Sequence, residues 1–362
     1  MFLTIIIFIL ILGILIFAHE LGHFITAKRA GIKVDEFGFG FPPRIFGVKK
    51  GETTYSLNLF PIGGFVKIYG EEGEGRDDIR SFSSKSLSRR AIIIAAGVTM
   101  NLVLAALLLS LGHWVGLPSM IDDEANGNLN NPQVQIIETA KDSPVEKAGI
   151  KIGDTIASLK LKVENEKLEI SRVAEVREFT EAHRGEEVVV IIQRGDEILE
   201  KTLVLRENPP EGEGPLGAAL VRTAIVSYPW YKAIILGITS TVNLIWVIIA
   251  AFLSIIWNLI TTGRLITEIA GPVGIFTLTS QAAKLGFIYV LQFTALLSIN
   301  LAIINILPFP ALDGGRLLFL FIEKIKGSPV SQKIEKIIHT AGFIILILLM
   351  LAVTWRDVVK LF

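Results

Sequence analysis

Residues 2–29 read FLTIIIFILILGILIFAHELGHFITAKR, and this stretch decides what kind of protein the chain forms. From Phe2 to Ala27 it is almost entirely apolar, which is long enough for a helix to cross a bilayer. Lys28 and Arg29 follow at once, and the run lacks the basic start of a cleaved signal peptide. We therefore expect a retained transmembrane helix over residues 1–27, with an extracytoplasmic N-terminus.

His19-Glu20-Leu21-Gly22-His23 lies inside this apolar run. Residues four apart on a helix project from nearly the same face, so both imidazoles can bind one zinc ion at about 2.0–2.1 Å. Glu20 lies beside them, placed to take a proton from a water molecule on the metal. His19 is about 14 Å inside the helix end, where polar side chains usually mark a functional site. The alternative is a polar pair that joins two helices.

Of the 362 residues, 51% are hydrophobic and 19% are charged, but a soluble domain is already nearly half apolar. The clustering of the apolar residues into long runs is what indicates a membrane protein. The net charge is zero, which gives no reason to expect nucleic acid as a partner. The chain has no cysteine, which excludes disulfides, thiolate ligands and a cysteine nucleophile. A metal must therefore be held by His, Asp or Glu.

Three further transmembrane helices are expected over residues 91–115, 285–315 and 337–354. Residues 28–90 carry many Lys and Arg side chains, which places them in the cytosol. The fold class is thus a polytopic α-helical membrane protein with four spans. An acidic, strand-rich block over residues 118–228 is expected on the outer side of the membrane.

Asp313 is the candidate for a third metal ligand, since a catalytic zinc site has three protein ligands and one open position. Pro308 and Pro310 precede it and interrupt the helix, and broken backbone at membrane depth needs protein or a water-filled cavity beside it. The alternative is that Asp313 only caps the end of the third span.

These motifs resemble the site-2 protease family of intramembrane zinc metalloproteases, especially its bacterial sigma-E-regulator branch. The family pairs HExxH in its first span with NxxPxPxLDG in a later one, which is complete here from Asn305 to Gly314. Its GxxxN motif matches Gly97 and Asn101, although Val98 stands where many members have proline. The resemblance also extends to Gly271-Pro272-Val273-Gly274 and runs from residue 1 to the last span.

The resemblance implies Zn²⁺ as the cofactor, held by His19, His23 and Asp313, with Glu20 as the general base. It also implies substrate-binding roles, for Asn305, Asn101, Gly63 and Gly64. The glycine pair ends the partly alternating stretch 55–65, which suits a β-hairpin. The family resemblance implies that this hairpin re-enters the membrane near the active site. An exposed strand edge there would hold an unwound substrate segment, whereas the alternative is an ordinary amphipathic loop.

Residues 229–284 are ambiguous, because their apolar helix over 233–260 carries a stripe of small or polar side chains. If Asp313 reaches the zinc, the third span runs from outside to inside, and the chain must be outside before residue 285. We therefore expect this helix to lie in the outer membrane interface and not to span the bilayer.

Residues 143–156, SPVEKAGIKIGDTI, resemble a PDZ domain of bacterial proteases, which we place at residues 133–207 as a single copy. Such a domain binds peptides by strand addition. Two roles stay open, namely binding of a newly exposed C-terminus and exclusion of substrates with bulky outer domains.

The function that the sequence predicts is regulated intramembrane proteolysis of single-span membrane proteins in the bacterial inner membrane. Anti-sigma factors and signal-peptide remnants are the candidate substrates. The alternatives are a non-catalytic membrane-embedded PDZ adaptor and a transporter with buried polar residues. The intact set of His19, Glu20, His23 and Asp313 favours the protease, and the chain has no detectable inverted repeat typical of many transporters.

Overall fold

The computed structural model describes residues 2–71, 73–124, 130–162, 167–195, 197–263 and 270–359. The chain divides into two compact units, the first built from Met1–Leu111 and Ile234–Phe362 and the second from Gly112–Ala233. Residues 264–269 of the predicted interfacial segment lie outside the described part.

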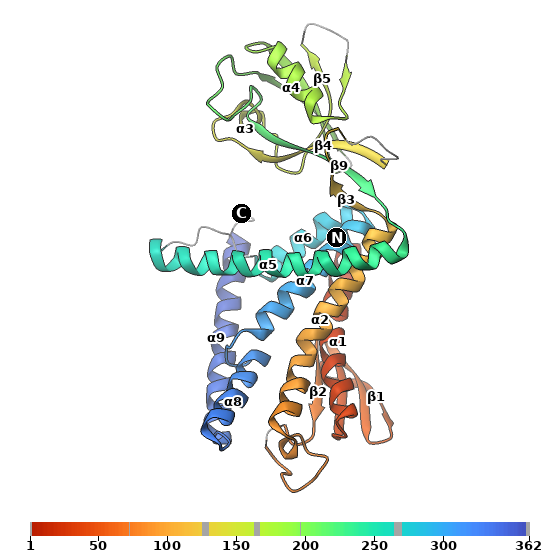
Figure 1. Cartoon of the computed structure of the whole chain (residues 1–362), viewed down its shortest axis with the longest axis vertical. Coiled ribbons are helices and arrows are strands. Elements are labelled where there is room, and N and C mark those ends of the chain that lie inside the picture. Colours follow the sequence, from red (N-terminus) through yellow and green to blue (C-terminus); the bar gives the residue numbers. More distant parts are fainter. Residues whose placement is uncertain are drawn as a thin grey trace. The chain divides into compact units, whose positions relative to one another are not determined.

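The helices that build the first unit are drawn in Figure 1. They are α1 (Phe2–Arg29), η1 (Phe82–Ser84), α2 (Leu87–Val115), α5 (Trp230–Thr262), α6 (Pro272–Leu285), α7 (Phe287–Ile306), α8 (Asp313–Lys326) and α9 (Gln332–Val359). Five of them, α1, α2, α5, α7 and α9, are long and apolar enough to cross a membrane. Length and composition alone therefore do not select four spans from these five helices.

The helices α1 and α2 cross at two glycines. A Cβ atom on Gly22 would overlap the carbonyl of Ala96, and a Cβ atom on Gly97 would overlap the imidazole of His23. A Cβ on Gly97 would also lie 2.8 Å from Cε1 of His19. The Gly97 position of the GxxxN motif therefore lets α2 pack directly against both histidine rings.

The third predicted span ends earlier than its predicted range, at Ile306. The N–H of Leu307 bonds to the carbonyl of Ile304, after which a turn leads into α8 at Asp313. The break follows from Pro308 and Pro310, which cannot donate backbone hydrogen bonds. Asp313 therefore stands at the start of a separate helix, where its carboxylate can turn away from the axis of α7.

The sheet of the first unit consists of β1 (Val34–Lys50) and β2 (Thr53–Ile68), which pair antiparallel beside α1. Residues 34–39 pair with 64–68 on one side and with 54–57 on the other. Residues 44–50 pair in turn with 53–58. The expected hairpin is thus folded back on itself, so that its two strands form four neighbouring stretches.

The long helix α5 runs across the other long helices of its unit (Figure 1). It packs on α2 and α7 through a short apolar contact around Ile248, which is buried with Ala105 and Ile299. The small and polar stripe noted in the sequence is mostly exposed, including Asn243 and Ser254, while Asn258 is half-buried. The stripe therefore does not serve as the contact with the rest of the protein.

The second unit contains a sheet in the order β3-β9-β4-β5-β7-β8, with β6 beside β5. Its elements are β3 (Leu117–Met120), β4 (Asn130–Thr139), α3 (Pro144–Lys147), β5 (Thr155–Leu161), β6 (Leu168–Glu169), α4 (Val173–Ala182), β7 (Glu187–Arg194), β8 (Glu197–Val204) and β9 (Ala218–Val226). Because β9 is hydrogen-bonded between β3 and β4, the folded unit extends beyond the predicted 133–207.

The SPVEKAGIKIGDTI stretch folds locally as its residues predict. Ser143 caps α3 by accepting a hydrogen bond from the N–H of Glu146, at 3.2 Å. Asp154 is buried and takes two hydrogen bonds of 2.7 Å from the guanidinium of Arg194, which raises the pKa of that arginine further. This bidentate pair fixes the turn that leads into β5.

Candidate metal centre

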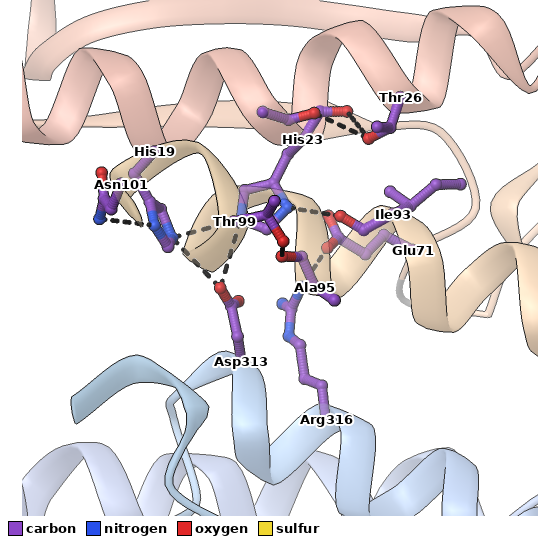
Figure 2. A network of polar contacts seen from close by, with 11 residues as sticks. His19, His23, Thr26, Glu71, Ile93, Ala95, Thr99, Asn101, Asp313 and Arg316 are labelled. Carbon is purple, nitrogen blue, oxygen red and sulfur yellow. Dashed lines mark hydrogen bonds and ion pairs between the residues drawn. The ribbon is translucent and has the colours of Figure 1, made fainter. Parts of the chain in front are cut away.

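His19 and His23 of α1 meet Asp313, which lies almost three hundred residues later in the chain, as Figure 2 shows. Nε2 of His19 lies 3.2 Å from Nε2 of His23. Oδ2 of Asp313 lies 3.2 Å from the first nitrogen and 3.3 Å from the second. All three side chains are largely buried, with 12% to 15% of their surface exposed. Among the described residues, these three form the group of His, Asp and Glu side chains that could hold a metal ion.

The triangle of donor atoms fits zinc. Tetrahedral ligands at about 2.0–2.1 Å from zinc lie about 3.3–3.4 Å from one another. The observed separations of 3.2 and 3.3 Å match that geometry. Two imidazole nitrogens and a carboxylate oxygen this close repel one another through their lone pairs unless a cation or proton lies between them. Three protein donors also leave a fourth position for water or substrate, as in catalytic zinc sites.

A backbone carbonyl sets the tautomer of His23. Its Nδ1 donates a hydrogen bond of 2.8 Å to the carbonyl oxygen of Ile93 on α2. The proton is thereby held on Nδ1, and the lone pair of Nε2 faces the other two donor atoms. The contact needs no particular side chain at residue 93, so the sequence offers no signal for it.

Asn101 of α2 is the hydrogen-bond partner of Nδ1 of His19. It is fully buried, and its amide lies 3.3 Å from Nδ1 of His19. In the orientation described, Nδ2 faces His19 while Oδ1 is buried without a hydrogen-bond partner among the described residues. A half-turn of the amide, whose two ends have the same shape, lets Oδ1 accept the proton of Nδ1. The Nε2 lone pair of His19 then points to the metal position.

The sheet passes close to Glu20. A Cβ atom on Gly64 would lie 3.4 Å from Cγ of Glu20 and 3.0 Å from Cγ2 of Ile16. A side chain at this position would be in tight contact with α1. The backbone of β2 therefore runs directly beside the carboxylate that follows His19 in the sequence.

The other residues predicted to bind substrate lie on β2, α7 and α2. Gly63 has a φ of +128°, which favours glycine, and it packs against Phe41 of the sheet. Asn305 lies in the last turn of α7 and is half-buried. Asn101 lies against a histidine, so its predicted contact with substrate stays a prediction.

Two charged pairs attach α8 to neighbouring elements. Arg316 forms an ion pair with Glu71, in the segment after β2 (Figure 2). Arg90 of α2 bonds to Glu323 at 2.5 Å. Both pairs line a cavity of about 630 Å³ that does not include the three donor side chains. They hold α8, and with it Asp313, against α2 and the sheet.

The long apolar helices and the group of three donor atoms are those of a membrane protein with a candidate metal site. The chain belongs to peptidase family M50, whose model matches residues 7–349. The resemblance to the site-2 protease family is therefore confirmed. Zinc is the cofactor, and the chain is a multi-pass bacterial membrane protein that acts as an intramembrane protease.

Similar proteins cover the chain almost completely. A zinc metalloprotease of Clostridium perfringens is 36% identical over 95% of both chains. A zinc metalloprotease of Clostridium acetobutylicum is 34% identical over 99% of this chain and 98% of its own length. The regulator of sigma-W protease RasP of Bacillus subtilis is 33% identical over 99% of both chains. That alignment spans 447 positions against 362 residues here, so the Bacillus protein contains additional segments.

Proposed function

We propose that the zinc is held by His19, His23 and Asp313 and that Glu20 is the general base of peptide-bond hydrolysis. The observation that carries the proposal is the triangle of donor atoms with sides of 3.2 to 3.3 Å. When bound, zinc polarises the scissile carbonyl and lowers the pKa of a water molecule towards neutrality. Glu20 takes the proton from the attacking water and passes it to the nitrogen of the leaving amine.

The substrates of this protein are, in our proposal, single-span membrane proteins. The sheet beside α1 supports this, because β2 passes Glu20 at Gly64 and can hold an unwound segment by strand addition. Asn305 would bind the substrate backbone near the scissile bond. The name of the Bacillus subtilis relative suggests an anti-sigma factor as one substrate, and signal-peptide remnants are a second candidate class.

The proposal is tested with a purified reporter that has one apolar span, a short outer part and helix-weakening residues near its centre. Reconstituted wild-type protein should cleave it, whereas the Glu20→Gln variant and chelator-treated protein should not. Cleavage that is insensitive to both would show that the activity belongs to a contaminant. No cleavage of several reporters by zinc-loaded wild type would favour the adaptor function.

Asn101, in turn, is proposed to orient His19 and not to bind substrate. Its burial and its contact with Nδ1 of His19 support this role. A hydrogen bond from the second ring nitrogen fixes the rotation of a metal-binding imidazole and raises its basicity.

We further propose that the protein has four spans, formed by α1, α2, α7 and α9, and that α5 lies in the outer interface. The support is the course of α5 across the other helices and the exposure of its polar stripe (Figure 1). The basic segment over residues 28–90 then lies in the cytosol, with the N-terminus and the second unit outside.

Labelling of single thiols tests this topology, because the natural chain has no cysteine. Thr261→Cys, at the exposed end of α5, should react with an impermeant maleimide added outside intact cells. Glu197→Cys in the second unit is the matched outer control, and Lys50→Cys in the hairpin is the cytosolic control. Protection of Thr261→Cys to the same extent as Lys50→Cys would mean that α5 spans the bilayer.

The second unit is proposed to be an extracytoplasmic PDZ domain with a peptide groove between α4 and β9. A cavity of about 450 Å³ lies there. One end of the groove is filled by the chain itself, since Ile121 pairs with Arg222 at 3.0 Å and the carboxylate of Asp123 accepts from the N–H groups of Val173 and Ala174. A bound peptide would therefore pair with β9 before Arg222.

The size-filter role of this domain has a direct test. Leu117 and Val226 are paired neighbours in β3 and β9, so residues 118–225 can be removed and replaced by a short Gly-Ser linker. If the domain excludes bulky substrates, this variant should cleave reporters with long outer domains that the wild type leaves intact. A short reporter is the control and should be cleaved by both. Long reporters that stay uncut would refute the filter.

A further inference from the structure

The turn that carries Asp313 has an unusual backbone. Ala311, two residues before Asp313, has a φ of +75°, in the left-handed region that residues with a Cβ atom rarely adopt. Such a conformation persists only where surrounding contacts hold it. The contacts made by this turn therefore decide where the carboxylate of Asp313 lies.

One of these contacts comes from α9, a helix that supplies no metal donor. The N–H of Ala311 donates a hydrogen bond of 2.9 Å to Nδ1 of His339. Because Nδ1 is the acceptor, the proton of the neutral imidazole lies on Nε2. The ring also packs on Phe319 of α8, with 5.4 Å between the ring centroids.

The same face of α9 provides a second contact. Gly342 lies three residues after His339 and so shares its side of the helix. A Cβ atom on Gly342 would lie 2.6 Å from the carbonyl oxygen of Pro310 and 2.8 Å from its carbonyl carbon. The helix α9 therefore lies in direct contact with the backbone of the turn. His339 accepts a hydrogen bond from Ala311, and Gly342 packs against Pro310.

We propose that His339 is a positioning residue of the zinc site, which holds Ala311 in its left-handed conformation and thereby places Asp313 against the two histidines. The inference rests on the proposed role of Asp313 as a zinc ligand. The donor triangle then has an outer hydrogen-bond partner for each member, namely Asn101 for His19, the carbonyl of Ile93 for His23, and His339 through the turn for Asp313.

The test measures the zinc dissociation constant of the purified full-length protein in detergent by competition with a chromophoric chelator. His339→Leu removes the acceptor and should weaken zinc binding by about 10–100-fold, as for other outer partners of metal ligands. His339→Asn places an oxygen at the position of Nδ1 and should restore the affinity. His339→Gln moves the acceptor one carbon further and should not.

Three further variants make the result decisive. Thr340→Ala changes the neighbouring, exposed residue of α9 and should bind zinc as the wild type does. Gly342→Ala should weaken binding, because it pushes Pro310 away. Asp313→Ala distinguishes failure of the proposed metal site from failure of the proposed role of His339. Normal zinc binding by Asp313→Ala would refute the metal site itself. Loss of zinc by Asp313→Ala together with normal binding by His339→Leu would refute only the role of His339.

The absorption of the Co²⁺-loaded proteins is a second readout, because it reports ligand geometry independently of cleavage. His339→Leu should lose intensity from the tetrahedral Co²⁺ bands, whereas His339→Asn should keep them. If His339→Leu is not recovered in folded form, the test rests on the comparison of His339→Asn with His339→Gln. Equal affinities and spectra for these two variants would overturn the proposal.

Discussion

Glu20→Gln is expected to abolish cleavage of the single-span reporter and to leave the zinc content unchanged. Gln has the shape of Glu but cannot take up a proton, so the loss should be about 10²–10⁴-fold in rate. Zinc should stay bound because Glu20 is not one of the three donors that lie within 3.3 Å of one another. The measurement pairs reporter cleavage with elemental analysis of the same preparation.

The control for this variant is Glu52→Gln. Glu52 is a carboxylate of the same unit, in the turn of the sheet, where it bonds to Lys28 at 2.8 Å. Its loss should leave both cleavage and zinc content as in the wild type. Undiminished cleavage by Glu20→Gln would exclude Glu20 as the base, and loss of zinc from this variant would show that Glu20 helps to hold the metal.

Asp313→Ala is expected to lose zinc and with it all cleavage. The change removes one of three donors and leaves two neutral imidazoles, which lack the negative charge that balances the ion. Its effect should exceed the roughly 10–100-fold loss of affinity that removal of an outer hydrogen-bond partner causes. The zinc dissociation constant measures it, together with the thermal unfolding midpoint of the zinc-free protein as a check on folding.

Asn101→Leu is expected to weaken zinc binding less than Asp313→Ala does, as measured in the same assay. It keeps the volume at a fully buried position but frees Nδ1 of His19, so zinc should bind about 10–100-fold more weakly. Thr99→Val is the matched control, because Thr99 is exposed on the same helix and its hydroxyl bonds to the carbonyl of Ala95. Wild-type zinc affinity in Asn101→Leu would refute the orienting role of Asn101 and leave its predicted role in substrate binding.

The second unit, Gly112–Ala233, is larger than the domain that the sequence predicts over residues 133–207. The SPVEKAGIKIGDTI stretch predicts its cap, helix and turn because these depend on neighbouring residues, and the structure contains all three. Strand β9 was not included in the predicted 133–207, since its place between β3 and β4 depends on pairing across about a hundred residues. His339 lies near the start of the span predicted over residues 337–354, and no local pattern there indicates that its Nδ1 accepts a hydrogen bond from the N–H of Ala311.

Features that depend on spacing along one helix follow from the order of residues alone. His19 and His23 share a face because residues four apart always do, and Pro308 with Pro310 must end α7 because neither can donate a backbone hydrogen bond. Long apolar runs likewise determine that the chain enters a membrane.

Which distant groups meet depends on how the helices pack against one another. Gly22 and Gly97 let α2 pack against the two histidines, and Asp313 reaches them from α8, which ion pairs attach to α2 and to the segment after β2 and whose preceding turn contacts His339. The partners of Asn101 and the exposure of the polar stripe on α5 were settled in the same way. Such contacts join residues from different helices, and their distances follow from packing, which local spacing does not specify.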